Sequence, residues 1–293
     1  MRGWREISLR IQKEYLEIVS NVLIEQGASG IEEVEEEENL SLLKAYFPVN
    51  EKNRRVGESL KKYFKSLKAV LPQFPSVEIK TKFFEEKDWS EGWKKYFKPI
   101  RVGPKLVVFP PWTRVRLKKG EIPILITPGM GFGTGTHSTT QLCMKALIRR
   151  IKRGVSVLDV GTGSGILSIV AARLGAKEVW GMDIDGEALE LARENVKQND
   201  LSKIVHIRKG GVGRIRKEFD LVVANIDFKT LWQIRNPLVN RLKPKGILIL
   251  SGILRAEEKK LRDHYLKIDS LGYLEGKRGK EWVCLTFKKK LKR

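Results

Sequence analysis

The sequence predicts an α/β protein made of two unlike parts, a small α+β domain followed by a mostly parallel sheet with helices on both faces. Within the first 85 residues, strand and helix patterns follow one another in the order βαββαβ. From residue 155 onward, single strands alternate with single helices, which is typical of a parallel sheet. Residues 271–290 have the pattern of a closing hairpin, so the last strand is expected to lie antiparallel.

The first part begins with residues 4–11, where polar and apolar residues alternate as in a strand. Residues 13–27 then place apolar side chains at helical spacing and end on a glycine. The order βαββαβ is that of a ferredoxin-like fold. The other predicted elements are a hairpin over 30–38 and 41–48 with Glu35–Glu38 and Asn39 at its turn, a helix over 53–71 and a strand over 76–85.

Residues 86–103 are predicted to be an aromatic linker helix. Trp89, Trp93 and Phe97 recur every four residues, which places three aromatic rings on one face of a short helix until a proline ends it. Two interpretations stay open: the rings anchor the linker to a domain, or they stack on nucleic-acid bases.

The second part, residues 104–293, alternates strands with helices. Its central strand patterns are rich in Val, Ile and Leu, as expected for strands buried on both faces. The predicted strands lie at 105–112, 122–129, 155–161, 178–185, 203–209, 219–226 and 246–253, and the predicted helices at 164–174, 186–198, 230–242 and 257–265.

Composition limits the class of protein. The chain has 293 residues, of which 41% are hydrophobic, enough for one large or two ordinary domains. It opens on MRGWREISLR without an apolar signal segment and has no run of about 18 apolar residues, so we expect a soluble, cytoplasmic protein that does not contact a membrane. Cys143 and Cys284 lack the paired spacing of a zinc or redox site, so both are expected to be buried small hydrophobes.

The net charge of +22 is unevenly distributed along the chain. Residues 1–80 hold 13 basic side chains and 13 glutamates without any aspartate, whereas residues 81–293 hold 44 basic and 22 acidic side chains. Such an excess indicates contact with nucleic acid or with an anionic particle. A Lys- and Glu-rich surface of the thermophile type is the alternative.

Two glycine-rich segments are candidates for ligand binding. Residues 127–144, TPGMGFGTGTHSTTQLCM, place four glycines within seven residues, which indicates either backbone held close to a ligand or an ordinary turn. In LDVGTGSGIL, a buried strand pattern reaches Asp159 and is followed by three glycines, Gly161 and Gly163 among them. The dinucleotide fingerprint needs a glycine where Ile166 stands, so a hydride-transferring enzyme is disfavoured.

Polar residues end the next strands at the same edge of the predicted sheet. Asp183 ends VWGMD, and a carboxylate there can accept both hydroxyls of a ribose, while Asp185 suits the N-cap of the following helix better. Asn225 ends FDLVVAN, where an amide can orient an incoming amine next to the reactive carbon of a cofactor. A plain strand-terminating asparagine is the alternative.

Taken together, these segments resemble one family, the methyltransferases of ribosomal protein L11, which use S-adenosylmethionine. The resemblance covers nearly the whole chain, including the DW…GWKKYFKP linker, PGMGFGTGTHSTT, LDVGTGSGIL, GMDID, VVANI and LSGIL. It implies a Rossmann-like class I methyltransferase sheet in residues 104–293, preceded by a ferredoxin-like domain in residues 1–85. Carried over by motif, it implies cofactor contacts from Thr140, Gly161, Gly163, Asp183 and Asn225.

The resemblance also implies an activity, methyl transfer to neutral amines of ribosomal protein L11, at lysine side chains and at the N-terminal amine. Asn225 is then the residue expected to act in catalysis, by orienting the amine. The electrically neutral front domain is expected to read the basic substrate. We further expect a monomer that makes a weak contact with ribosomal RNA.

Some features leave other readings open. Asp227 and Phe228 stand where the family often has Leu-Ala, and Gly131 replaces a common alanine, so the choice of target is less well indicated than the cofactor. His137 is a candidate for direct proton transfer or for orienting backbone. An RNA methyltransferase, favoured by the basic excess, and a non-catalytic ribosome-binding module are the alternative functions.

Overall fold

The computed structural model describes residues 3–37, 39–49, 53, 55–85, 98–128 and 135–291. Contacts within the chain divide it into two compact units, Met1–Lys98 and Pro99–Arg293. Among the described residues, no helix combines the length and the apolar character needed to cross a membrane.

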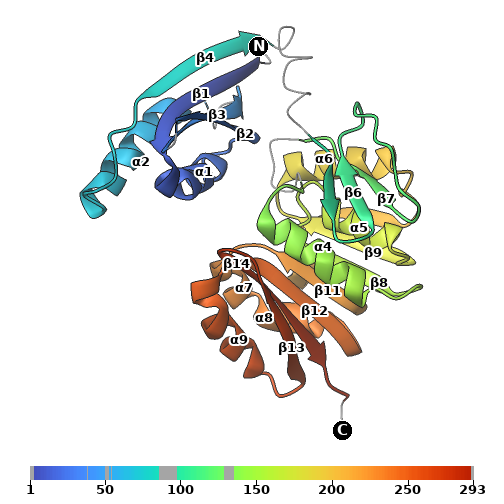
Figure 1. Cartoon of the computed structure of the whole chain (residues 1–293). Coiled ribbons are helices and arrows are strands. Elements are labelled where there is room, and N and C mark those ends of the chain that lie inside the picture. Colours follow the sequence, from blue (N-terminus) through green and yellow to red (C-terminus); the bar gives the residue numbers. More distant parts are fainter. Residues whose placement is uncertain are drawn as a thin grey trace. The chain divides into compact units, whose positions relative to one another are not determined.

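The front unit is a four-stranded antiparallel sheet that packs against two helices (Figure 1). Its elements are β1 (Gly3–Gln12), a 3₁₀ turn (Lys13–Tyr15), α1 (Leu16–Glu25), β2 (Gly30–Glu37), β3 (Leu40–Pro48), α2 (Val56–Val70) and β4 (Ile79–Glu85). Ile7, Leu9 and Ile11 alternate toward the helices and are fully buried with Leu23 and Leu60. The strand order β2-β3-β1-β4 is that of the ferredoxin-like fold, as predicted.

The structure corrects two details of the predicted front part. β2 continues through Glu37, so most of the acidic run belongs to a strand and not to a turn, and Glu38 lies outside the described residues. The last part of the predicted linker, after the proline expected to end its helix, is a strand, because Ile100–Val102 forms β5 and pairs with a neighbouring strand. The aromatic residues of that linker, within 86–97, also lie outside the described residues.

The second unit is built on a seven-stranded sheet in the order β10-β9-β8-β11-β12-β14-β13, with β14 antiparallel to its neighbours as predicted for the last strand. A small sheet, β5-β6-β7, accompanies it. The strands are β6 (Leu106–Phe109), β7 (Ile122–Leu125), β8 (Ser156–Val160), β9 (Glu178–Asp183), β10 (Val205–Lys209), β11 (Phe219–Asn225), β12 (Leu242–Leu254), β13 (Leu271–Arg278) and β14 (Trp282–Lys289), and the helices are α4 (Ser138–Arg150), α5 (Ile166–Arg173), α6 (Gly186–Gln198), α7 (Phe228–Gln233), α8 (Arg235–Asn240) and α9 (Glu258–Leu266).

Hydrophobic side chains cover both faces of this sheet. One buried cluster joins the sheet to α4, α5 and the small sheet, and the other joins it to α7, α8 and α9. All residues of β8 are buried, as expected for a central parallel strand. Cys143 and Cys284 are buried in the first cluster, which confirms their predicted role as small hydrophobes.

The helix predicted over 230–242 is wrong in length, because two short helices, α7 and α8, take its place. The chain leaves helical geometry at Ile234, and Pro237 lies in the first turn of α8. In a continuous helix the proline ring would clash with the carbonyl four residues earlier, whereas the first turn of a helix has no backbone bond to lose there.

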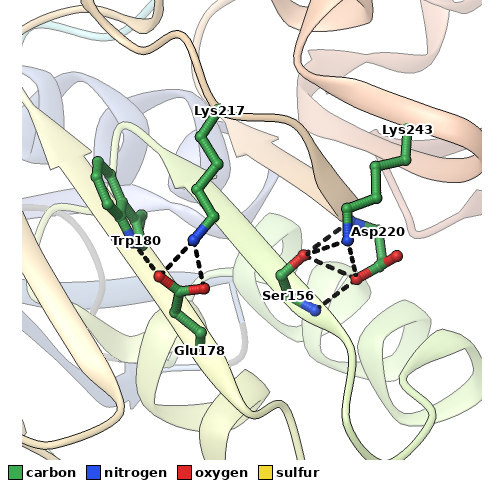
Figure 2. A network of polar contacts seen from close by, with 6 residues as sticks. All are labelled: Ser156, Glu178, Trp180, Lys217, Asp220 and Lys243. Carbon is green, nitrogen blue, oxygen red and sulfur yellow. Dashed lines mark hydrogen bonds and ion pairs between the residues drawn. The ribbon is translucent and has the colours of Figure 1, made fainter.

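Ion pairs join the amino-terminal ends of the central strands (Figure 2). The Asp220 carboxylate accepts hydrogen bonds from the backbone N–H of Ser156 at 2.8 Å, from its hydroxyl at 2.7 Å and from Lys243 at 2.9 Å. Glu178 accepts from both Trp180 and Lys217. Partial burial acts to raise the pKa of Asp220, but these hydrogen bonds lower it on balance. This end of the sheet is therefore closed by polar contacts, and the carboxyl-terminal edge carries the candidate site.

Candidate functional site

A glycine turn leads from β8 into α5 at the carboxyl-terminal edge of the sheet. Gly161, Gly163 and Gly165 all have positive φ, at 73°, 52° and 81°. The space that a side chain on Gly161 would fill is taken by Ile226, whose Cγ2 lies 2.3 Å from the position of the missing Cβ. Only glycine therefore fits at Gly161, both for its backbone geometry and for the packing around it.

Asp183 ends β9 directly beside this turn. Its carboxylate accepts a hydrogen bond from the Gly163 N–H at 2.9 Å and another from the Asp185 N–H at 3.1 Å. Asp185 is the N-cap of α6 and accepts from the Glu187 N–H at 3.0 Å. The structure thus assigns the cap to Asp185, as predicted, and leaves Asp183 next to the turn.

Thr140 and Asn225 meet although 85 positions separate them in the chain. The Asn225 amide donates to the Thr140 hydroxyl at 3.4 Å, and Thr140 is 1% exposed. The amide oxygen of Asn225 is buried and has no hydrogen-bond partner among the described residues. A buried acceptor without a donor is costly, so this oxygen is suited to a donor brought by a ligand.

His137 is the N-cap of α4, the helix that carries Thr140. Its Nδ1 accepts from the Thr139 N–H at 3.4 Å and lies 2.6 Å from the Thr139 hydroxyl, while its ring meets Trp282 edge-on at 5.0 Å. Burial lowers the pKa of His137. These contacts agree with a histidine that orients backbone, and direct proton transfer stays a hypothesis.

The glycine/threonine loop before α4 is only partly described. Gly129, Gly131 and Gly133 lie outside the described residues. Gly135 has φ of 85°, and a Cβ there would stand 3.1 Å from both Val108 and Ile166. The described end of the loop therefore packs closely against the beginning of α5.

Sequence reasoning missed two residues near these groups. Ile184, between two aspartates just after β9, is 77% exposed, more than any other large apolar side chain of the described residues. Asp159 is completely buried, accepts from Thr162 and Ser168 at 2.7 Å each, and keeps one carboxylate oxygen without a partner among the described residues. An apolar residue flanked by acids was a signal for Ile184, whereas the hydrogen bonds of Asp159 and its unpartnered oxygen needed the tertiary structure.

Asp159 is expected to make stability depend on pH. Burial raises its pKa to about 6, against the hydrogen bonds of Thr162 and Ser168. The folded protein then retains a proton that the unfolded chain has lost above about pH 4, so stability falls as the pH rises through 6. Asp159→Asn removes this titrating group. The free energy of unfolding of the variant, measured with urea, should therefore increase relative to that of the wild type by roughly 1 to 1.5 kcal/mol from pH 5 to pH 8.

Asp220→Asn is the matched control for this measurement. The pKa of Asp220 is lowered, so it titrates below this range and its contribution is lost only as the pH falls further. The difference between Asp220→Asn and the wild type should therefore stay flat from about pH 5 to pH 8. A flat difference for Asp159→Asn as well would contradict the expectation.

The comparisons with known proteins agree with this geometry. A family model described as "Ribosomal protein L11 methyltransferase (PrmA)" matches residues 3–290. The chain belongs to this family.

Proteins named ribosomal protein L11 methyltransferase are similar to this chain over most of their length. One from Caldanaerobacter subterraneus subsp. tengcongensis is 35% identical over 312 residues, covering 98% of this chain and 99% of its own. Another from Alkaliphilus metalliredigens is 37% identical over 276 residues, covering 86% and 87%.

A solved structure is also similar, that of a ribosomal protein L11 methylase from Lactobacillus delbrueckii subsp. bulgaricus. It has a TM-score of 0.62 at 32% identity and covers 67% of this chain and 100% of that one. A tRNA methyltransferase structure from M. jannaschii has a TM-score of 0.50 over 98% of this chain, and at 15% identity this shows the fold alone. Membership of the L11 methyltransferase family thus rests on sequence along nearly the whole chain.

Proposed function

We propose that this chain transfers methyl groups from S-adenosylmethionine to amines of ribosomal protein L11. The observation that carries the proposal is the meeting of Asn225 with Thr140 at the sheet edge that also holds the glycine turn and Asp183. Relatives at 35% and 37% identity are named for methylation of this ribosomal protein. Lysine side chains are the proposed targets, and the N-terminal amine is a further one.

The residues present fit the cofactor. Asp183 offers carboxylate oxygens to ribose hydroxyls beside a turn where Gly161 and Gly163 let the backbone approach closely. The exposed side chain of Ile184 offers an apolar surface for the adenine ring. The unpartnered oxygen of Asn225 offers an acceptor to the cofactor's cationic amino group or to the incoming amine. When bound, S-adenosylmethionine supplies a methyl group on a cationic sulfonium.

Asn225 is the residue proposed to act on the amine. Its amide would hold the amine with the lone pair directed at the methyl carbon, and positioning of this kind accounts for a large share of enzymatic rate. A protonated lysine has no lone pair, so a desolvated site that favours the neutral amine is required. His137 is assigned no part in this positioning step: it is the N-cap of α4, and its Nδ1 contacts Thr139.

The front domain, residues 1–85, is proposed to read the substrate, with the methyltransferase domain in residues 104–293. The proposal is supported by its balanced charge, which contrasts with the basic second part. β2 is an edge strand, and its Glu32 contacts Tyr46 and Lys44 within the sheet. Acidic side chains on a sheet edge suit a basic ribosomal protein as partner. We also propose a cytoplasmic monomer that contacts ribosomal RNA weakly.

The decisive experiment is incubation with radiolabelled S-adenosylmethionine and a ribosomal extract from cells lacking the enzyme. We expect label in one small basic protein, sensitive to protease and resistant to ribonuclease, with mass spectrometry placing the added mass on lysines. Label in RNA would instead favour the RNA methyltransferase alternative. The basic excess of residues 81–293 is the observation that supports this alternative. Cofactor binding without any transfer would favour a non-catalytic module.

A further inference from the structure

We propose that Ile226 and Gly252 form a clamp that fixes Asn225 relative to the glycine turn, which makes both of them positioning residues for methyl transfer. The inference rests on the proposed function and concerns the backbone that carries Asn225. Neither residue was among the site residues predicted from the sequence.

Asn225 has little to hold its own side chain. Its one hydrogen bond with a described residue, to Thr140, is 3.4 Å long, and its amide oxygen is buried without a partner among the described residues. A bond of that length contributes little orientation. The direction of the Asn225 amide must therefore come chiefly from the backbone at the end of β11.

The side chain of Ile226 joins this backbone to the glycine turn. Its Cγ2 lies 2.3 Å from where a Cβ on Gly161 would stand, so Ile226 fills the space left by the missing side chain. Gly161 has φ of 73° and follows the last residue of β8. The strand end that carries Asn225 is thus packed directly on the turn proposed to approach the cofactor.

The other side of Ile226 is held by β12. The Ile226 N–H donates to the Ser251 carbonyl at 3.2 Å, and the register between β12 and β14 shifts between Leu250 and Ile253. At this irregularity Gly252 has φ of 87°, and a Cβ there would stand 2.4 Å from the Ile226 carbonyl oxygen. Irregular strand positions beside functional sites commonly redirect side chains.

The clamp therefore has two parts, a side-chain contact with Gly161 and a backbone contact with Gly252. Both act on the residue next to Asn225. A displacement of about 1 Å at a reacting group can cost on the order of 100-fold in rate, so a clamp of this kind affects the chemical step more than cofactor binding.

The test compares Ile226→Ala and Gly252→Ala with the wild type. We expect kcat to fall by roughly 10- to 100-fold in both variants. The Kd for S-adenosylmethionine should change by less than about threefold, since the proposed ribose contact at Asp183 is untouched. Ile226→Val keeps the Cγ2 atom and should recover most of the activity lost in Ile226→Ala.

Gly154→Ala is the control for backbone strain. Gly154 also has φ of 87°, but a Cβ there would meet nothing within 4 Å, so the variant carries the strain without the clash. We expect Gly154→Ala to retain wild-type kcat. An equal loss of kcat in Gly154→Ala and Gly252→Ala would overturn the role of Gly252. Ile226→Ala adds no atoms, so it keeps the test decisive if Gly252→Ala does not fold.

A second readout needs neither cofactor nor activity. The side-chain amide signals of Asn225 in a ¹⁵N NMR spectrum are assigned by their loss in Asn225→Asp. We expect them to shift or broaden in Ile226→Ala and Gly252→Ala and to return in Ile226→Val. Unchanged Asn225 signals in both alanine variants would overturn the clamp. If the wild type does not methylate the ribosomal protein, the proposed function is contradicted. The NMR signals would still test the clamp, because they require no methyl transfer.

Discussion

Replacing Asp183 with alanine is expected to weaken binding of S-adenosylmethionine by roughly 10- to 100-fold, because hydrogen bonds to a charged group are worth about 1.5 to 3 kcal/mol. The structure places this carboxylate beside the glycine turn, where it accepts from the Gly163 N–H at 2.9 Å. Isothermal titration with the cofactor in the absence of protein substrate measures the effect directly.

Asp185→Ala is the matched control, since it removes a neighbouring carboxylate at the N-terminus of α6. Asp185 caps α6 through the Glu187 N–H, so its loss should cost about 1 kcal/mol of stability and leave the cofactor Kd within a few-fold of the wild type. Asp183→Asn adds a finer test, because an amide can still accept from Gly163 but bears no charge. Equal losses of affinity in the Asp183 and Asp185 variants would count against ribose binding by Asp183.

Replacing Asn225 with alanine is expected to lower kcat for methylation of the ribosomal protein by roughly 100- to 1000-fold, because the amine loses the group that orients it. Cofactor binding should weaken by less than about tenfold, since one neutral hydrogen bond contributes about 1 kcal/mol. Single-turnover transfer with saturating cofactor separates the two effects.

Asn240→Ala, which changes an exposed asparagine at the end of α8, is the surface control and should leave kcat unchanged. Asn225→Asp keeps the shape and one acceptor but introduces a buried charge next to Thr140. Its transfer rate should also fall. Wild-type kcat in Asn225→Ala would show that Asn225 does not act on the amine, whatever its role in cofactor binding.

The local elements of the site could be predicted from the sequence because their signals are short-range. A buried strand that runs into closely spaced glycines predicts a tight turn, and Gly161 and Gly163 do have positive φ. The sequence predicts that Asp185 caps α6 because N-capping depends on residues a few positions apart, and this N-cap is confirmed. The roles in cofactor binding stay predictions.

Errors arose where longer-range packing overrides local pattern. The linker pattern did not show that Ile100–Val102 would find a strand partner in β6. The prediction of one helix over 230–242 overlooked Pro237, a local signal in the sequence that lies in the first turn of α8. Asp227 is the N-cap of α7 through Thr230, so this departure from the family's usual residue has a local structural reason.

By itself, the sequence determined the ferredoxin-like front, the alternation of strands with helices after residue 155, the antiparallel last strand and the glycine turn after β8, because each depends on periodicity or on residues close in the chain. Only the tertiary structure decided that Asn225 meets Thr140 and that Ile226 fills the space beside Gly161 and lies against Gly252. Such contacts join segments far apart in the chain, and they depend on how strands align and side chains fill volume, which no local pattern encodes.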